Sequence, residues 1–495
     1  MVYVYTFIGG KWHVRGQLPD KVAVEIPLYL SGFFVDEERE VCETMTQKNS
    51  FTQGPILGPM LRFTLPVLGA ILLQTMYGAV DMLVVGRFAE AADVSAVSTG
   101  SWLMQLVTSL ITGVSMGTTV LLGRRIGEER PEEAGRLIGS SIVLFALITA
   151  VITVLMECFA NPIARIMQVP KEAFSATLQY VRICAGGAVF IVAYNVLGSI
   201  FRGLGNSRIP LMTVAIACVV NIAGDLLLVG ALRMAAAGAA IATVAAQGIS
   251  VALSLLIIRK QKMSFSFRLR DIRWDAPRMG EVLRMGLPIA LQDVLVSISF
   301  LAITAIVNSL GVIVSAGVGV AERLSGFVML VPSAFGQSMA AIVAQNIGAK
   351  QYARAKKCML YGIGASLAAG AVMAYFAFFH GEPLSMIFAR DAQVVAASAE
   401  YLKATAIDTL LVSIMFVMVG YFNGCGKTFF VMLQGILGAF GVRIPVSLAM
   451  SRLTPVSVFA VGLATPASTV LQIVLCVGYY VMLRRRERKT ELIKE

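Results

Sequence analysis

The sequence predicts an all-α polytopic membrane protein with twelve transmembrane helices in two six-helix lobes. Its 495 residues are 57% hydrophobic and 14% charged, whereas about a quarter of the residues of a soluble protein are charged. The apolar residues occur in runs of about 20, long enough to cross a hydrocarbon core of ~30 Å as a helix. Backbone groups in lipid must be hydrogen-bonded within the chain, so we expect helices and not open sheets.

Twelve apolar runs are present, at residues 61–85, 95–121, 137–157, 180–201, 209–229, 237–258, 286–310, 318–343, 358–379, 394–422, 429–449 and 458–483. They divide into a first lobe at 45–258 and a second at 285–483. A basic segment at 259–284 is predicted to be a cytoplasmic linker with a helix along the membrane surface, and 484–495 a basic cytoplasmic tail. Residues 1–44 are expected to be a flexible extension, and Met45 is an alternative start of the natural chain.

The two lobes are predicted to be copies of one unit, because three segments recur at an offset of 221 or 222 residues. The recurring pairs are Leu61–Pro66 with Leu283–Pro288, Ile126–Gly127 with Ile347–Gly348, and Phe201–Gly205 with Phe422–Gly426. Six helices per copy is an even number, so both copies enter the membrane in the same direction. A pseudo-twofold axis along the membrane normal is therefore expected, with a substrate path between the lobes.

The net charge of +12 follows the topology and does not indicate nucleic acid. With a cytoplasmic N-terminus, the even-numbered connections and the tail carry 25 basic residues, against 6 in the odd-numbered connections. This is the asymmetry of the positive-inside rule, and it predicts a multi-pass protein of the plasma membrane with both termini in the cytoplasm. Seven scattered cysteines and two histidines predict neither a disulfide framework nor a histidine metal site.

Four oxygen-bearing side chains of the first lobe are predicted to lie at one depth in the outer half of the membrane: Asp81, Asn221, Asp225 and Thr243. Asp81 lies ~27 Å and Asp225 ~24 Å from the inner ends of their helices, and Asn221 and Asp225 share a helix face. Such a set can bind a small hard cation or share a proton. Alternatively, the carboxylates are solvated at the outer interface, and the other two residues hydrogen-bond between helices.

These residues belong to motifs that resemble the multidrug and toxic compound extrusion (MATE) family over residues 52–483. The motifs are Gln74-x2-Tyr77-x3-Asp81, Phe201-Arg202-Gly203-Leu204-Gly205, Asn221-x3-Asp225, Gly238-Ala239-Ala240-x-Ala242-Thr243 and Ala344-Gln345-Asn346-Ile347-Gly348. The resemblance implies two six-helix lobes facing each other in a V, and exchange of Na⁺ or H⁺ for an organic substrate. It also implies that Asp81, Asn221, Asp225 and Thr243 form the cation site.

The second lobe departs from the family pattern. Ser297 stands where some members have a glutamate of a second ion site, so that site is not carried over. We expect Gln74, Tyr77, Asp293 and Asp408 to line the substrate pathway. For Asp293 a polar contact that closes the inner ends of the lobes is an equal alternative. Pro66 and Pro288, at equivalent places in the two copies, indicate a shared bend or a hinge.

The sequence therefore predicts a secondary-active efflux transporter that exchanges Na⁺ or H⁺ for an organic, cationic and amphipathic drug or metabolite by alternating access. We expect a monomer without cofactors, whose partners are the substrate and the lipid bilayer. A lipid-linked oligosaccharide or lipid flippase is the alternative, but it would need a strongly basic cavity. A membrane enzyme is disfavoured, because the chain has no catalytic cluster and no long loop other than 259–284.

Overall fold

The computed structural model describes residues 4–8, 11–15, 51–260, 267–453, 455 and 457–492. The chain divides into two compact units, Met1–Gln47 and Lys48–Glu495. In the first unit, strands β1 (Val4–Ile8) and β2 (Lys11–Arg15) pair antiparallel, with Val4 opposite Arg15. The sequence did not predict these strands. The rest of the predicted flexible extension, 1–44, lies outside the described residues.

The described part of the second unit is helical. Its first lobe holds α2 (Leu57–Phe88), α3 (Ala91–Gly127), α4 (Pro131–Ile166), α5 (Lys171–Gly186), α6 (Ala188–Gly203), α7 (Arg208–Asp225), the π-helix η1 (Leu226–Ala231) and α8 (Ala235–Lys260). The 3-10 helix η2 (Leu269–Asp271) follows in the segment between the lobes and contacts α4. The second lobe holds α9 (Ala276–Asn308), α10 (Val312–Val328), α11 (Leu330–Gly348), α12 (Tyr352–Phe379), α13 (Gly381–Met386), α14 (Ala392–Gly424), α15 (Thr428–Ile436), the π-helix η3 (Leu437–Arg443), α16 (Ile444–Ser451), α17 (Val458–Gly462) and α18 (Ala464–Leu492).

By length and composition, 11 helices of the described residues can cross a membrane, or 12 when the bent pair α5 and α6 is counted as one span. The predicted helical membrane fold is confirmed. The predicted single helix at 180–201 is wrong, because the chain bends by 54° between α5 and α6. The break falls at Gly187, where an added Cβ would collide with the Val244 side chain of α8. Glycine at this position therefore lets the start of α6 pack tightly on α8.

The seventh predicted helix also begins earlier than the sequence suggested. Helix α9 begins at Ala276 and is capped by Asp275, whose carboxylate accepts from the Arg278 backbone N–H at 3.2 Å. The last residues of the segment predicted as linker, 259–284, are therefore the first turns of this helix. An acidic N-cap satisfies a free N–H of the first turn, and this capping accounts for the position of the helix start.

The internal repeat is visible in two equivalent turns. Helices α6 and α14 both end in a left-handed glycine, Gly205 with φ +83° and Gly426 with φ +73°. The next N–H then bonds back to the helix, from Asn206 to the Phe201 carbonyl at 2.9 Å and from Lys427 to the Phe422 carbonyl at 2.8 Å. This is the Schellman end that glycine favours. The Gly424–Thr428 segment is thus the end of α14 and the turn into α15.

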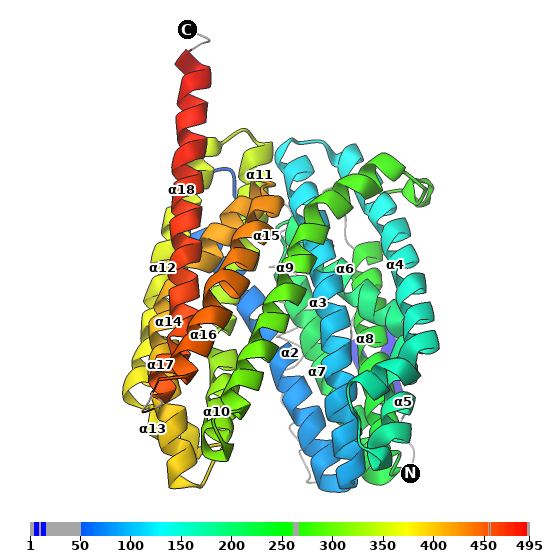
Figure 1. Cartoon of the computed structure of the whole chain (residues 1–495). Helices are drawn as coiled ribbons and strands as arrows, with labels where there is room; N and C mark the ends of the chain where they lie inside the picture. The colour runs from blue at the N-terminus through cyan, green and yellow to red at the C-terminus, as the bar shows by residue number, and fades with distance from the viewer. Residues whose placement is uncertain are drawn as a thin grey trace, which may run out of the picture. The chain divides into compact units, whose positions relative to one another are not determined.

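The two lobes meet where α3 packs against α9 and α11, side by side at the centre of the second unit (Figure 1). We call this contact the lobe junction. The lobe junction lies toward one end of the helical bundle, which we call the basic end. The helices that finish at this end include α3, α6, α8, α11 and α14. A Cβ added to Gly117 of α3 would lie 2.6 Å from the Val282 carbonyl of α9, and one added to Gly123 would lie 3.1 Å from Ala344 of α11. Small residues thus let the helices approach closely.

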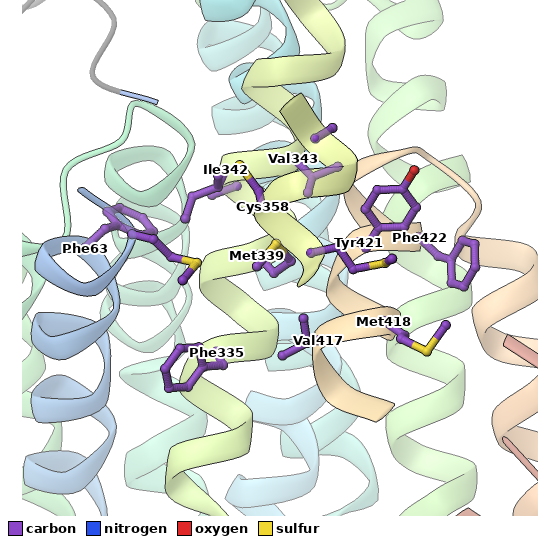
Figure 2. Close-up of a cluster of buried hydrophobic side chains, with 14 of the residues drawn as sticks. Phe63, Phe335, Met339, Ile342, Val343, Cys358, Val417, Met418, Tyr421 and Phe422 are labelled. Carbon is purple, nitrogen blue, oxygen red and sulfur yellow. The ribbon is translucent and has the colours of Figure 1, made fainter. Parts of the chain in front are cut away.

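A large apolar cluster supports the basic end of the second lobe and reaches the first. Figure 2 shows Phe63 of α2 beside Phe335 and Met339 of α11, with side chains of α12 and α14 on the far side. Arg354 of α12 fixes the segment before α2, because its guanidinium donates to the Phe51 and Gly54 carbonyls, both at 2.8 Å. The start of α2 is therefore held by the second lobe.

Candidate cation site and central cavity

Helices α2, α7 and α8 bring together the four side chains that the sequence singled out. Asp81, Asn221 and Asp225 are buried, with exposed fractions of 5%, 1% and 0%, and Thr243 is partly buried. The Asn221 Nδ2 donates to Thr243 Oγ1 at 3.5 Å. The burial of the two carboxylates contradicts the first part of the alternative, in which they are solvated at the outer interface. The bond from Asn221 to Thr243 agrees with its second part, a hydrogen bond between helices.

Four oxygens of this cluster lack hydrogen-bond donors. Both oxygens of Asp225, Oδ1 of Asp81 and Oδ1 of Asn221 are buried without a partner among the described residues. The Asp81 and Asp225 carboxylates lie close enough to interact electrostatically. A buried charged group without a partner costs several kcal/mol (order of magnitude), so the arrangement is suited to a cation or a proton that supplies the missing partner.

The backbone around Asp225 has two features that place its carboxylate. Asp225 is the last residue of α7, and the π-helix η1 follows it directly; π-helical turns are frequent at functional sites. The preceding Gly224 allows α7 and α8 to approach, since a Cβ there would lie 3.0 Å from the Cβ of Ala242. Asp225 thus lies at the point where α7 passes close to α8 and changes to a π-helix.

The cluster contains two carboxylates, one amide and one hydroxyl. Within the described residues, no group of three or more His, Cys, Asp or Glu side chains could hold a metal ion. Oxygen ligands with few charges suit a small hard cation. The donor set therefore suits a small monovalent cation or a proton.

A cavity of about 550 Å³ lies beside this cluster, mainly among α2, α3, α6 and α7. Gln74 lines it from the first lobe and Asp293 from the second. Tyr77 does not line it but lies between Gln74 and Asp81, and contacts Gln247 of α8. Gln74, Tyr77 and Asp81 share one face of α2, so this face connects the cavity with the carboxylate cluster.

Asp408 does not line this cavity, contrary to the prediction. Its side chain has an exposed fraction of 2% and accepts a hydrogen bond from Thr469 Oγ1 at 2.6 Å. Arg443 of η3 interacts electrostatically with Asp408, donates to Ser299 Oγ at 3.1 Å and lies 4.5 Å from the ring centroid of Phe300. Asp408 thus belongs to a buried polar network of the second lobe.

Sequence reasoning missed Thr469 and Ser299 in this network. Arg443 carried a signal, because a charged side chain within an apolar run is conspicuous in a membrane protein.

The duplicated helical unit, the buried carboxylates of the first lobe and a cavity that residues of both lobes line are typical of a secondary transporter. The family model described as MatE matches residues 66–227 and 288–449, one match in each lobe. The chain therefore belongs to the MatE family of membrane transporters.

Relatives and solved structures agree with this assignment. The chain is 25% identical to the probable multidrug resistance protein YoeA of Bacillus subtilis, over 91% of this chain and 98% of that one. It is 24% identical to the multidrug export protein MepA of Staphylococcus saprophyticus, over 81% and 89%. A structure described as the outward-facing conformation of a multidrug resistance MATE family transporter shares the fold, with a TM-score of 0.82, 19% identity and coverage of 89% and 98%.

Proposed function

We propose that the protein is a secondary-active exporter that exchanges Na⁺ or H⁺ for an organic, cationic and amphipathic small molecule. The observation that carries this proposal is the buried Asp81–Asp225 pair beside the cavity, in which three of the four carboxylate oxygens have no hydrogen-bond partner among the described residues. The names of the relatives, which include a multidrug resistance protein and a multidrug export protein, support export as the direction and a drug-like cargo.

The coupling ion acts by changing the balance between two arrangements of the lobes. A ligand shifts such an equilibrium only by its differential affinity for the two states. Two carboxylates without donors repel each other, and a bound cation or proton removes this repulsion. Movement of α7 against α2 would change the distance between Asp81 and Asp225, and hence the affinity of the site for the ion.

The cavity supplies the substrate site in this proposal. Gln74 and Asp293 come from different lobes, so a substrate held between them contacts both. The carboxylate of Asp293 is exposed to the cavity and can attract an organic cation. Because Arg202 is the only basic side chain among the residues that line this cavity, a flippase for pyrophosphate-linked lipids is not favoured.

Orientation follows from charge. We place the basic end in the cytoplasm of a cell whose plasma membrane holds the protein, because basic residues concentrate in cytoplasmic connections. The structure then corresponds to the state in which the lobes are closed toward the cytoplasm. One chain carries both the cavity and the carboxylate pair, so we propose that a monomer transports.

Everted membrane vesicles test the proposal with a fluorescent lipophilic cation as substrate. Imposing Na⁺ and H⁺ gradients separately on wild-type vesicles should drive uptake under one of them, and Asp225→Asn should abolish it. Uptake that persists in Asp225→Asn would contradict coupling through this site. Absence of uptake under both gradients, with the protein present and folded, would contradict export of organic cations.

A further inference from the structure

A second cavity, of about 1120 Å³, lies at the basic end on the side of the lobe junction where α3, α9, α15 and α18 meet. It shares no lining residue with the central cavity. The stacked rings of Phe430 and Tyr479, 3.9 Å apart with an interplanar angle of 10°, form part of its wall. The proposed transport function assigns no role to this space.

The rim of this cavity is cationic. Four basic residues and two acidic ones line it. Arg125 is satisfied by Glu128 at 3.0 Å and approaches Glu281 at 3.8 Å. Among the described residues, Arg284 and Lys427 have no ion pair, so their charges are available to a ligand.

Arg124 adds a third available cation from the first lobe. Its Nη2 reaches the Gly424 carbonyl at 3.4 Å, and its Nε is buried without a partner among the described residues. Arg284 and Lys427 belong to the second lobe. The cavity thus gathers three cationic groups from both sides of the lobe junction.

The walls below this rim are apolar and open. Leu287 and Leu291 of α9, with Phe429 and Leu433 of α15, line the cavity and are exposed. Leu291 lies seven residues beyond Arg284, and Leu433 six beyond Lys427, which places both ~10 Å deeper in the membrane. The basic residues at the rim therefore lie at the depth of a phospholipid headgroup, and the apolar residues below them lie at the depth of its acyl chains.

We propose that this cavity binds an anionic phospholipid of the adjacent leaflet, with its phosphate at Arg124, Arg284 and Lys427 and an acyl chain along α9 and α15. Basic pockets between transmembrane helices bind such headgroups. A free phosphate would use the rim but would leave four exposed apolar side chains without a function. Because the headgroup contacts both lobes, the bound lipid favours the state in which the lobe junction is closed.

Lipid titration by native mass spectrometry tests the proposal on the delipidated full chain. Phosphatidylglycerol and phosphatidylcholine with identical acyl chains are added in separate experiments. We expect the wild type to bind the first phosphatidylglycerol about tenfold more tightly than phosphatidylcholine. The double variant Arg284→Gln/Lys427→Gln should lose most of this preference for phosphatidylglycerol. Arg124 is left unchanged because it also bonds across the lobe junction.

The control variant Arg136→Gln/Arg259→Gln removes two exposed charges from the same end of the bundle, away from the cavity. It should keep the preference for phosphatidylglycerol. The proposal would be overturned if both double variants lost the preference for phosphatidylglycerol equally, or if the wild type bound phosphatidylglycerol and phosphatidylcholine with the same affinity. Displacement of the lipid by glycerol 3-phosphate at equimolar concentration would also overturn it, in favour of a soluble anion. An unchanged unfolding temperature of each variant shows that the fold is retained.

Discussion

Arg124 and Gln345 occupy equivalent positions of the two lobes, and each donates a hydrogen bond across the lobe junction. Arg124 Nη2 donates to the Gly424 carbonyl at 3.4 Å, and Gln345 Nε2 donates to the Gly203 carbonyl at 3.0 Å. Gln345 follows Arg124 by 221 residues, and Gly424 follows Gly203 by the same number. The pair is therefore related by the pseudo-twofold of the duplicated unit, and it holds the basic end closed.

The first prediction concerns this closed state. Gly117→Val should open the lobe junction, because even a Cβ would lie 2.6 Å from the Val282 carbonyl. The measurement is the distance between spin labels at Glu90 and Val312, which lie at the end opposite the basic end; Gly117→Val should shift the distribution toward shorter values. Gly364→Val is the control, since no atom lies within 4 Å of its added Cβ. Identical distributions for Gly117→Val and the control would contradict the prediction.

The second prediction separates substrate binding from ion coupling. Asp293→Asn removes the carboxylate of the central cavity and should weaken binding of a lipophilic cation about tenfold, the usual effect of losing one hydrogen bond to a charged group. The Na⁺ or H⁺ dependence of that binding should remain. Fluorescence titration measures both, and Asp93→Asn at the far end of α3 is the control. Loss of the ion dependence in Asp293→Asn would place Asp293 in the coupling site.

The third prediction assigns a structural role to the polar network of the second lobe. Thr469→Val removes the donor to Asp408 and should lower the free energy of unfolding by about 1–3 kcal/mol, the cost of an unsatisfied buried acceptor. The double variant Asp408→Asn/Thr469→Val should recover part of this loss, because the amide carries no charge. Unfolding temperatures in detergent give the comparison. Transport lost at unchanged stability would instead indicate a functional role for Asp408.

The fourth prediction is a pH dependence of stability outside the membrane-spanning segments. Burial acts to raise the pKa of Asp275, but hydrogen bonds from the backbone and side chain of Arg278 outweigh it, so this pKa lies below its ordinary value. A carboxylate whose pKa is lowered by folding stabilises the folded state fully at pH values above its pKa in the unfolded chain, ~3.9. This stabilisation is lost as the pH falls through its pKa in the folded state. Asp275→Ala should therefore destabilise by about 1 kcal/mol at pH 7.

The difference between the same variant and wild type should shrink as the pH falls below ~3.9, the pKa of Asp275 in the unfolded chain, and should vanish only below the lowered pKa of the folded state. Unfolding temperatures measured between pH 3 and pH 7 provide the test. A destabilisation that stays constant across this range would show that the carboxylate charge does not matter for the cap.

The sequence predicted the helical repeat and the carboxylate cluster because both leave local signals. Polar residues within apolar runs are conspicuous, and Asp81, Asn221 and Asp225 are buried on helices α2 and α7 as the spacing suggested. The break at Gly187 was not predictable, since it depends on contact with Val244 of a helix distant in sequence. Asp408 was placed wrongly for a related reason: helix periodicity does not reveal that Thr469 and Arg443 enclose it.

The polar network of the second lobe also could not be predicted from the sequence. Arg443 was visible as an intramembrane cation, but its neighbours Ser299 and Phe300 lie on α9, about 140 residues earlier in the chain. Only tertiary packing joins them. The cationic cavity at the basic end is likewise formed by α3, α9, α15 and α18. These helices lie far apart in the sequence, so local sequence patterns could not predict the cavity.

The exchange of an ion for the substrate through the Asp81–Asp225 site is tested most directly by measuring how the ion changes the affinity for the substrate. The purified protein is titrated with a fluorescent lipophilic cation at increasing Na⁺ concentration and, separately, at decreasing pH. Binding free energies of linked ligands are coupled reciprocally, so the affinity of wild type should fall as the coupling ion rises, and that of Asp225→Asn should not change. An affinity of wild type that is independent of both ions, or an unaltered dependence in Asp225→Asn, would contradict exchange through the Asp81–Asp225 site.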